Sequence, residues 1–169
     1  MPVKTNSQLA AFFNTGDQPS EAEFGHLIDT IQPNPVFLEG NANENLTVAD
    51  HAFRTIIVDG SDADRTYTLP VPALGTWFHF VYIADLDAAD DADLQITNLA
   101  GDFLKGAVTH LDTDAGSTGG LAVIHANGSS HIGISLDLGA GADLWIMGFT
   151  ASLNYIWGNT TGATPATFV

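Results

Sequence analysis

The sequence predicts a mainly β fold, an antiparallel β-sandwich or jelly-roll-like domain preceded by two short N-terminal helices. Helical spacing of apolar residues occurs only between residues 5 and 31. From Val36 onward, short runs rich in β-branched and aromatic residues alternate with turns of Gly, Asp, Asn and Pro. The gaps between these runs are too short and too rich in Gly and Asp to hold crossover helices. Neighbouring strands are therefore expected to run antiparallel.

Two helices are expected in the first segment. Leu9, Phe12 and Phe13 fall at i, i+3 and i+4, which is the spacing of one helix face. A second apolar stripe is formed by Phe24, Leu27, Ile28 and Ile31. Ser20 and Glu23 have the spacing of a capping box that begins this second helix, and the Pro-Asn-Pro at 33–35 ends it. So short a helix is unstable alone, so its apolar stripe must dock on something.

The chain length of 169 residues suits one compact domain. The expected organisation is an N-terminal helical attachment or oligomerisation segment at 1–35, a β-sandwich domain at 36–157 and a flexible or strapping tail at 158–169. The expected strands fall at 51–58, 65–69, 76–84, 94–98, 121–126, 131–136, 144–153 and 155–157. Asn127-Gly128 is expected to turn a hairpin between the runs at 121–124 and 131–134.

Three of these runs, 78–83, 121–124 and 144–147, are apolar on both faces of the expected strand. A strand of this kind is buried on both sides. In one small sandwich the second face indicates a subunit interface, so a homo-oligomer is expected.

Charge excludes several classes of partner. The chain has 20 Asp and Glu against four Lys and Arg, a net charge of -16, so neither nucleic acid nor an anionic membrane surface is an expected partner. No apolar run approaches the length of about 20 residues that spans a bilayer. The first residues lack the apolar core of a signal peptide, so synthesis in the cytoplasm is expected. The absence of Cys excludes disulfides and thiolate chemistry.

Little in the sequence points to chemistry. The acidic run at 85–93 is open to two interpretations, a Ca²⁺ site or a solvated loop, but it lacks the pattern of an EF-hand. His125 and His131 would face each other across the expected hairpin, either as metal ligands or in cross-strand packing. There is no nucleophile elbow and no carboxylate pair in an apolar setting, so no enzyme and no cofactor are expected.

The aromatic residues also allow two interpretations. Trp77 and Trp145 lie within apolar runs, where packing in a core or an interface is expected. The segment 154–157, with Tyr155 and Trp157, is the exposed aromatic patch that a sugar ring would stack on.

Residues 4–30 resemble a short N-terminal module of tailed-phage structural proteins. The shared pattern is the Thr15-Gly16 turn, the Pro19-Ser20 cap and a helix that ends in Leu27-Ile28-Asp29-Thr30. The resemblance implies attachment or trimerisation on a virion. The remainder of the chain, closing with residues 143–150 and a Trp nearby, resembles the β-domains of small capsid decoration or head-fibre proteins.

The function that these resemblances imply is that of a capsid decoration, or cement, protein on the outer surface of the head shell. Its partners would be the major capsid protein and itself, as a homotrimer, and it would lie on the virion after synthesis in the host cytoplasm. The residues expected to dock the N-terminal segment are Leu9, Phe12, Phe13, Phe24, Leu27 and Ile28. The alternative is a short tail fibre or adaptor that recognises a host-surface glycan. A Ca²⁺-dependent depolymerase fragment is a third and weaker hypothesis.

Overall fold

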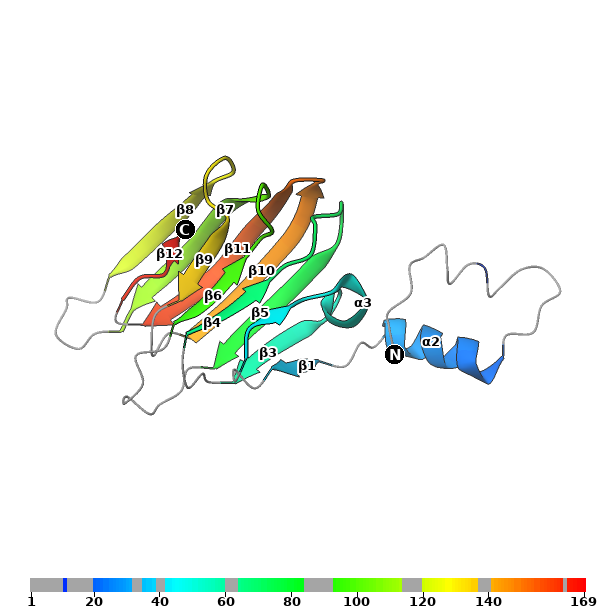
Figure 1. The fold of residues 1–169 in the computed structure, drawn as a ribbon. Coiled ribbons are helices and arrows are strands. Elements are labelled where there is room, and N and C mark those ends of the chain that lie inside the picture. The colour runs from blue at the N-terminus through cyan, green and yellow to red at the C-terminus, as the bar shows by residue number, and fades with distance from the viewer. Residues whose placement is uncertain are drawn as a thin grey trace.

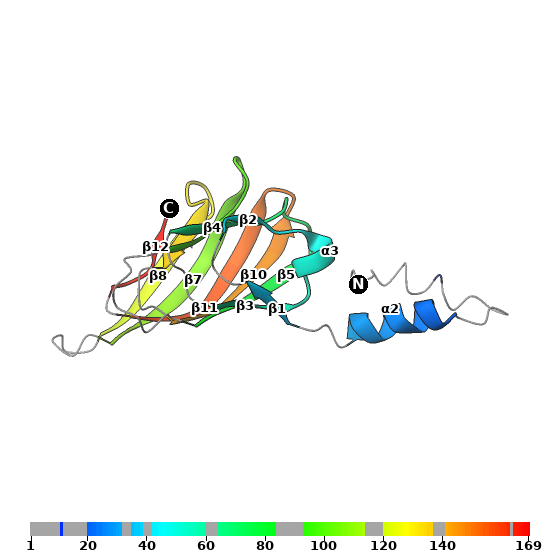
Figure 2. The ribbon, with the colours of Figure 1, turned by 60° about the horizontal axis from the view of Figure 1, so that its bottom comes forward.

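The computed structural model describes residues 11, 20–31, 35–38, 42–59, 64–83, 93–113, 120–136, 141–162 and 164–169, and it is mainly β. Two mixed sheets lie face to face (Figures 1 and 2). The large sheet has the order β1 (Val36–Leu38), β3 (Thr55–Asp59), β5 (Trp77–Ile83), β10 (Gly141–Thr150), β11 (Leu153–Gly162), β7 (Phe103–Asp112) and β8 (Leu121–Asn127). The small sheet has the order β12 (Thr167–Phe168), β9 (Gly133–Leu136), β6 (Leu94–Thr97), β4 (Arg65–Thr68) and β2 (Glu44–Asn45). A short helix, α3 (Val48–His51), follows β2.

The first half of the chain winds back and forth between the sheets. Strands β1, β3 and β5 belong to the large sheet and β2, β4 and β6 to the small one, so each consecutive strand crosses to the opposite layer. As a result β1, β3 and β5 pair in parallel, and so do β2, β4 and β6. The expectation of antiparallel neighbours was wrong for these strands. A parallel pair needs a long crossover, and here the crossover is a strand of the other sheet instead of a helix.

The second half of the chain is more nearly antiparallel. Strand β10 pairs antiparallel with both β5 and β11, β7 pairs antiparallel with β8, and β9 pairs antiparallel with β6 and β12. The exception is β11, which lies parallel to β7 over ten residue pairs, from Leu153 with Phe103 to Gly162 with Asp112. The jelly-roll-like arrangement stays a prediction.

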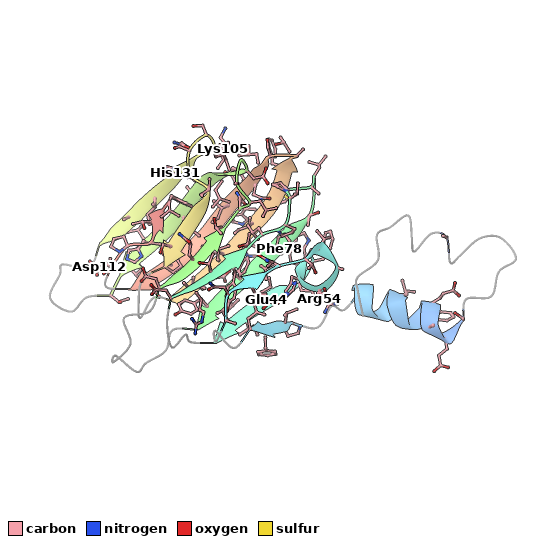
Figure 3. The ribbon with its side chains drawn as sticks, viewed as in Figure 1. Glu44, Arg54, Phe78, Lys105, Asp112 and His131 are labelled. Atoms are coloured by element: carbon pink, nitrogen blue, oxygen red, sulfur yellow. The ribbon has the colours of Figure 1, made fainter. Side chains whose placement is uncertain are left out.

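The core fills the space between the two sheets. Alternate residues of the large sheet point inward, including Ile56, Phe80 and Leu144, and they meet Tyr67 and Ile96 of the small sheet. Phe78, another residue of this core, is labelled in Figure 3. Fully burying an aliphatic or aromatic side chain of this size contributes about 1.5–3 kcal/mol. The remaining alternate residues of each strand therefore lie on the outer faces of the two sheets.

The Asn127-Gly128 turn exists but does not make the expected hairpin. Gly128 has a φ of 78°, and the Asn127 side-chain oxygen accepts hydrogen bonds from the Ser129 and Ser130 amides. However, β8 belongs to the large sheet and β9 to the small one. The turn therefore carries the chain from one layer to the other, and the hairpin prediction was wrong.

Sequence reasoning missed one long strand and shortened another. Strand β7 was not expected, because Lys105 and Gly106 interrupt its apolar pattern. Strand β11 continues past the expected boundary at Trp157 to Gly162, where Gly, Asn and Thr replace apolar residues. Farther on, β12 pairs with β9, and Val169 exchanges backbone hydrogen bonds with Gly133. This part of the chain therefore belongs to the two sheets.

The N-terminal segment contains α2 (Glu21–Ile31). The Ser20 amide and hydroxyl donate to Glu23 Oε2 at 2.7 and 2.8 Å, and the Glu23 amide donates to Ser20 Oγ at 3.3 Å. This is the reciprocal geometry of a capping box. The other expected helix, around Leu9 to Phe13, lies outside the described residues except for Ala11. In both ribbon views α2 lies apart from the two sheets, beyond β1 (Figures 1 and 2).

Candidate interaction surface: the outer face of the large sheet

The outer faces of the two sheets differ in chemistry. On the small sheet, one register row across the outer face consists of Thr66, Gln95, Ser135 and Thr167, which are all polar. On the large sheet, the outer rows through Trp77 and Trp145 carry mainly aromatic and aliphatic side chains, whereas the row through Asp143 is mixed. Because an ordinary solvated sheet has a polar outer face, the large sheet is the unusual one.

The structure brings all three of the doubly apolar runs into this sheet, as β5, β8 and β10. Their inward residues belong to the core, and their outward residues lie on the same outer face. That outward set includes Trp77, His79 and Val81 on β5, Asp143, Trp145, Met147 and Phe149 on β10, and Leu121, Val123 and His125 on β8.

Five side chains of this face form what we call the aromatic cluster: Trp77, His79, Trp145, Tyr155 and Trp157. Strand register places Trp145 between His79 and Trp157. The rings of Trp145 and Trp157 are 6.1 Å apart at their centroids and 13° from parallel, and Trp77 lies 5.2 Å from Trp145. Tyr155 extends the cluster, 6.0 Å from Trp157. These are ordinary distances for attractive aromatic pairs.

His79, which stacks on Trp145, is held in place by two polar contacts. Its Nε2 lies 2.8 Å from Asp143 Oδ1, and its Nδ1 lies 3.1 Å from Thr55 Oγ1. A carboxylate only accepts, so Nε2 donates its proton to Asp143, and in the neutral imidazole Nδ1 then accepts from the Thr55 hydroxyl. His79 is largely buried and Asp143 is exposed, so the imidazole is fixed in orientation while the carboxylate meets solvent.

Two glycines allow the strands under the cluster to approach closely. Gly106 and Gly158 have φ values of 141° and 142°, in the region that disfavours other residues. A Cβ on Gly106 would lie 1.9 Å from the Ile156 oxygen, and one on Gly158 would lie 2.1 Å from the Asp143 oxygen. Because Gly158 directly follows Trp157, this close packing also positions that ring.

The exposed end of the cluster agrees with the sequence interpretation of residues 154–157. Tyr155 and Trp157 are 41% and 37% exposed. Sequence reasoning missed that Trp77 and Trp145 lie on the same face. The alternation of Trp77, His79 and Val81 with Phe78, Phe80 and Tyr82 was the available signal, since every second residue of a strand shares a face.

A second part of the outer face is aliphatic and lies at the β7–β8 edge. Leu121 and Val123 are 72% and 54% exposed, and Leu111 pairs with Leu121 from the neighbouring strand. Apolar side chains this exposed on one face typically mark an interaction surface.

The expected docking residues of the N-terminal segment are only partly described. Leu9, Phe12 and Phe13 lie outside the described residues, and so does the side chain of Ile28. On α2, Phe24 is 48% exposed and Leu27 is partly buried. Among the described residues, α2 lies apart from the strands that carry the aromatic cluster (Figure 1).

The sequence candidates for metal binding gain no support from geometry. Of the acidic run at 85–93 only Asp93 is described, and among the described residues no three His, Asp or Glu side chains gather as metal ligands do. His131 Nδ1 instead accepts a hydrogen bond from the Asn127 amide, and its ring packs near Phe168. His125 is exposed on the outer face of β8.

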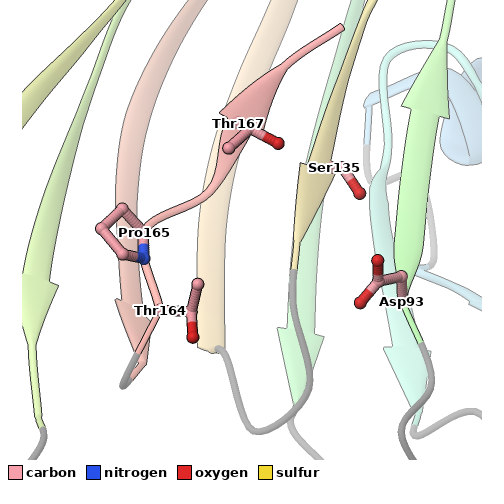
Figure 4. Close-up of a pocket in the computed structure, with 5 residues that line it drawn as sticks. All are labelled: Asp93, Ser135, Thr164, Pro165 and Thr167. Carbon is pink, nitrogen blue, oxygen red and sulfur yellow. The ribbon is translucent and has the colours of Figure 1, made fainter.

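A shallow hollow lies on the small sheet. It encloses about 250 Å³ and is lined by Asp93, Ser135, Thr164, Pro165 and Thr167 (Figure 4). Its lining offers one carboxylate and three hydroxyls, without the apolar wall that most small-molecule sites have. The outer face of the large sheet is therefore the stronger candidate.

Within the described part of the chain, none of the helices has the length and apolar character needed to cross a bilayer. No protein family model, no curated protein and no solved structure matches this chain.

Proposed function

We propose that this protein is a structural component of a tailed-phage virion, a capsid decoration protein that binds the outer surface of the head shell. It acts by assembly and not by catalysis. The observation that carries the proposal is the separation of α2 from the two sheets (Figure 1). On this helix the side chain of Phe24 is exposed. A short amphipathic helix that does not pack on the sheets of its own chain needs the surface of another protein to bury its apolar side.

The partner of the N-terminal segment in this proposal is the major capsid protein. The resemblance of residues 4–30 to phage attachment modules supports this choice, and so does the capping box, which defines where α2 begins. The docking residues are those of the apolar stripes, Leu9, Phe12, Phe13, Phe24, Leu27 and Ile28. The β body would then project outward, and the net charge of -16 would keep neighbouring particles apart.

The β body suits the same role. Two-layer β domains, jelly rolls among them, build many viral capsid proteins, and we propose a jelly-roll-like sandwich for this chain. The apolar outer face of the large sheet supports self-association, and the N-terminal resemblance implies a trimer. No enzymatic step and no cofactor are part of this proposal.

The test measures binding to phage heads that lack the protein. Deleting residues 1–32 should abolish binding while the β body keeps its thermal unfolding midpoint, because α2 lies apart from the sheets. Phe24→Ser should weaken binding, and Glu21→Ser, at an exposed position of the same helix, is the matched control. Unchanged binding after the deletion would contradict the proposal.

A second candidate function is recognition of a host-surface glycan by a short tail fibre or adaptor. The aromatic cluster favours it, because Trp145 and Trp157 are nearly parallel and the polar groups of His79 and Asp143 lie beside them. Sugar rings stack on aromatic faces and hydrogen-bond to neighbouring polar groups. Glycan-array binding that is lost in Trp157→Ala and retained in Phe37→Ala, an exposed residue outside the cluster, would favour this function.

A further inference from the structure

One edge of the large sheet is long and open. In the part of the chain that the structure describes, β8 pairs only with β7 and forms the end of the sheet. It has seven residues, whereas β1 at the opposite edge has three (Figures 1 and 2). An edge strand presents a row of backbone donors and acceptors to any strand that can reach it.

This edge lacks the usual protection against pairing. Natural edge strands carry Lys, Pro or other charged residues that block a further strand. Between residues 115 and 136 the sequence has no Asp, Glu, Lys, Arg or Pro, although the chain has 20 acidic residues in all. Strand β8 exposes Leu121, Val123 and His125 there. A stretch of an acidic protein that carries no Asp, Glu, Lys or Arg thus coincides with the longest open edge among the described strands.

The backbone hydrogen bonds identify which residues of β8 face outward. The Asp112 amide donates to the Gly120 oxygen, and the Gly128 amide donates to the Leu104 oxygen. Hydrogen-bonded pairs alternate along an antiparallel ladder, so the backbone amides and carbonyls of the even-numbered residues from Gly120 to Gly128 point toward β7. The amides and carbonyls of Leu121, Val123 and His125 therefore point away from the sheet. The Asn127 amide is already bonded to His131 Nδ1.

We propose that two copies of this chain pair through β8, antiparallel, about a two-fold axis that passes beside Val123. In this register Val123 faces Val123 of the second copy, and Leu121 faces the second copy's His125 in both directions. The backbone groups of Leu121, Val123 and His125 all point away from β7, at the open edge. In this register each of their amides and carbonyls therefore forms a hydrogen bond with the second copy. The two large sheets become one continuous sheet with a shared outer face.

A second copy fits this edge better than an unrelated strand does. The outward set is symmetric about Val123, so the edge is complementary to itself in one register, as an isologous contact requires. The other described edge strands of this chain, β1, β2 and β12, have only two or three residues. Two chains of charge -16 repel each other, and they can approach most closely where acidic residues are absent.

This inference is independent of the virion role, and it differs from the trimer that the N-terminal resemblance implies. The test uses the absence of Cys in the full chain. In Val123→Cys the two substituted residues should be about 5.5 Å apart at their Cα atoms, and their thiols should cross-link under a short bis-maleimide. The matched control is His125→Cys on the same face, where the two Cα atoms should be offset by four residues, or about 13 Å. The expected result is a covalent dimer for the Val123→Cys variant and little for the His125→Cys variant.

A second measurement, of the oligomeric state by sedimentation, tests the dimer even if the thiols fail to react with the cross-linker. Val123→Pro removes an outward amide without removing a bond to β7, so it should fold and remain monomeric in sedimentation equilibrium. Val123→Thr should still dimerise. A wild-type monomer at about 0.1 mM, a trimer in which the Val123→Cys variant does not cross-link, or a dimer that survives Val123→Pro would each overturn the inference. Head binding by a monomeric Val123→Pro variant would leave the proposed function standing.

Discussion

The ring of His79 lies flat on the indole of Trp145, with centroids 4.1 Å apart and planes 12° from parallel. The same imidazole reaches Asp143 through Nε2 at 2.8 Å. Asp143 and Trp145 are alternate residues of β10, so one strand supplies both the stacking surface and the carboxylate that orients the ring. The contact between His79 and Trp145 is therefore built by register between β5 and β10.

Trp145 should be the most important member of the aromatic cluster for stability. It contacts three rings, those of Trp77, His79 and Trp157. An aromatic pair contributes about 0.5–1.5 kcal/mol beyond its buried area, so Trp145→Leu should lower the free energy of unfolding by about 1–3 kcal/mol. Urea unfolding followed by near-ultraviolet circular dichroism would measure both the stability and the loss of ring coupling.

Phe37→Leu is the matched control for this experiment, because Phe37 is an exposed aromatic residue on β1. Its effect on the free energy of unfolding should stay within about 0.5 kcal/mol. If Trp145→Leu were no more destabilising than Phe37→Leu, the cluster would not be a packed unit.

Gly158→Ala should destabilise the β body through a backbone clash. The new Cβ would lie 2.1 Å from the Asp143 oxygen, and the φ of 142° is itself unfavourable for Ala. The clash adds to a strain of about 1–3 kcal/mol, so a total loss of about 2–4 kcal/mol in unfolding free energy is expected from thermal or urea denaturation.

Gly75→Ala separates the two contributions. Gly75 also has a positive φ, 80°, but a Cβ there would meet no atom within 4 Å. Only the strain of about 1–2 kcal/mol should appear. Equal losses for Gly75→Ala and Gly158→Ala would show that close packing of β11 on β10 is not the cause.

The sequence allowed the mainly β class and the positions of most strands to be predicted, because runs such as Leu94–Thr97 combine alternation with β-branched residues. It did not reveal the winding of β1 to β6 between two sheets. A strand shows the same alternation of buried side chains whether its neighbours are parallel or antiparallel. The difference depends on whether the loop after each strand leads to the same sheet or to the opposite one, which the alternation does not show. Strand β7 was missed because Gly106 interrupts its apolar pattern. A glycine is required there because the backbone of Ile156 lies too close for a Cβ, and the sequence does not show this contact.

The candidate surface was predicted in part. Three strands with two apolar faces indicated a second buried surface, and the structure places these strands in one sheet. The joining of Trp77, Trp145 and Trp157 into one cluster depends on the pairing of β5 with β10 and of β10 with β11. Long-range register of this kind is set by the whole sheet, so local pattern could not predict it.

Ser20→Ala should reduce the helix content of α2 and leave the β body unchanged. Ser20 and Glu23 satisfy each other's amides at the start of this helix. Loss of such a cap costs about 1 kcal/mol of helix stability. Backbone carbon chemical shifts of residues 21–31 should move toward coil values. Ser20→Asp, which keeps a capping oxygen, should retain them, and a fall in the melting midpoint of the sheets would contradict the separation of α2 from the body.

Salt should strengthen the β8 dimer. Each chain carries a net charge of -16, so association brings two like-charged chains together, although the proposed contact itself has no charged residue. The screening length falls from about 30 Å at 0.01 M salt to about 3 Å at 1 M, which removes most of this repulsion and leaves the uncharged hydrogen bonds and apolar contacts unaffected. Sedimentation equilibrium should therefore give a dissociation constant that decreases steadily as NaCl rises from about 0.05 to about 1 M.

Val123→Pro should remain monomeric throughout the series, which separates pairing at β8 from general salting-out. A dissociation constant that rises with salt would instead indicate an interface held by ion pairs, for which the stretch from 115 to 136 has no Asp, Glu, Lys or Arg.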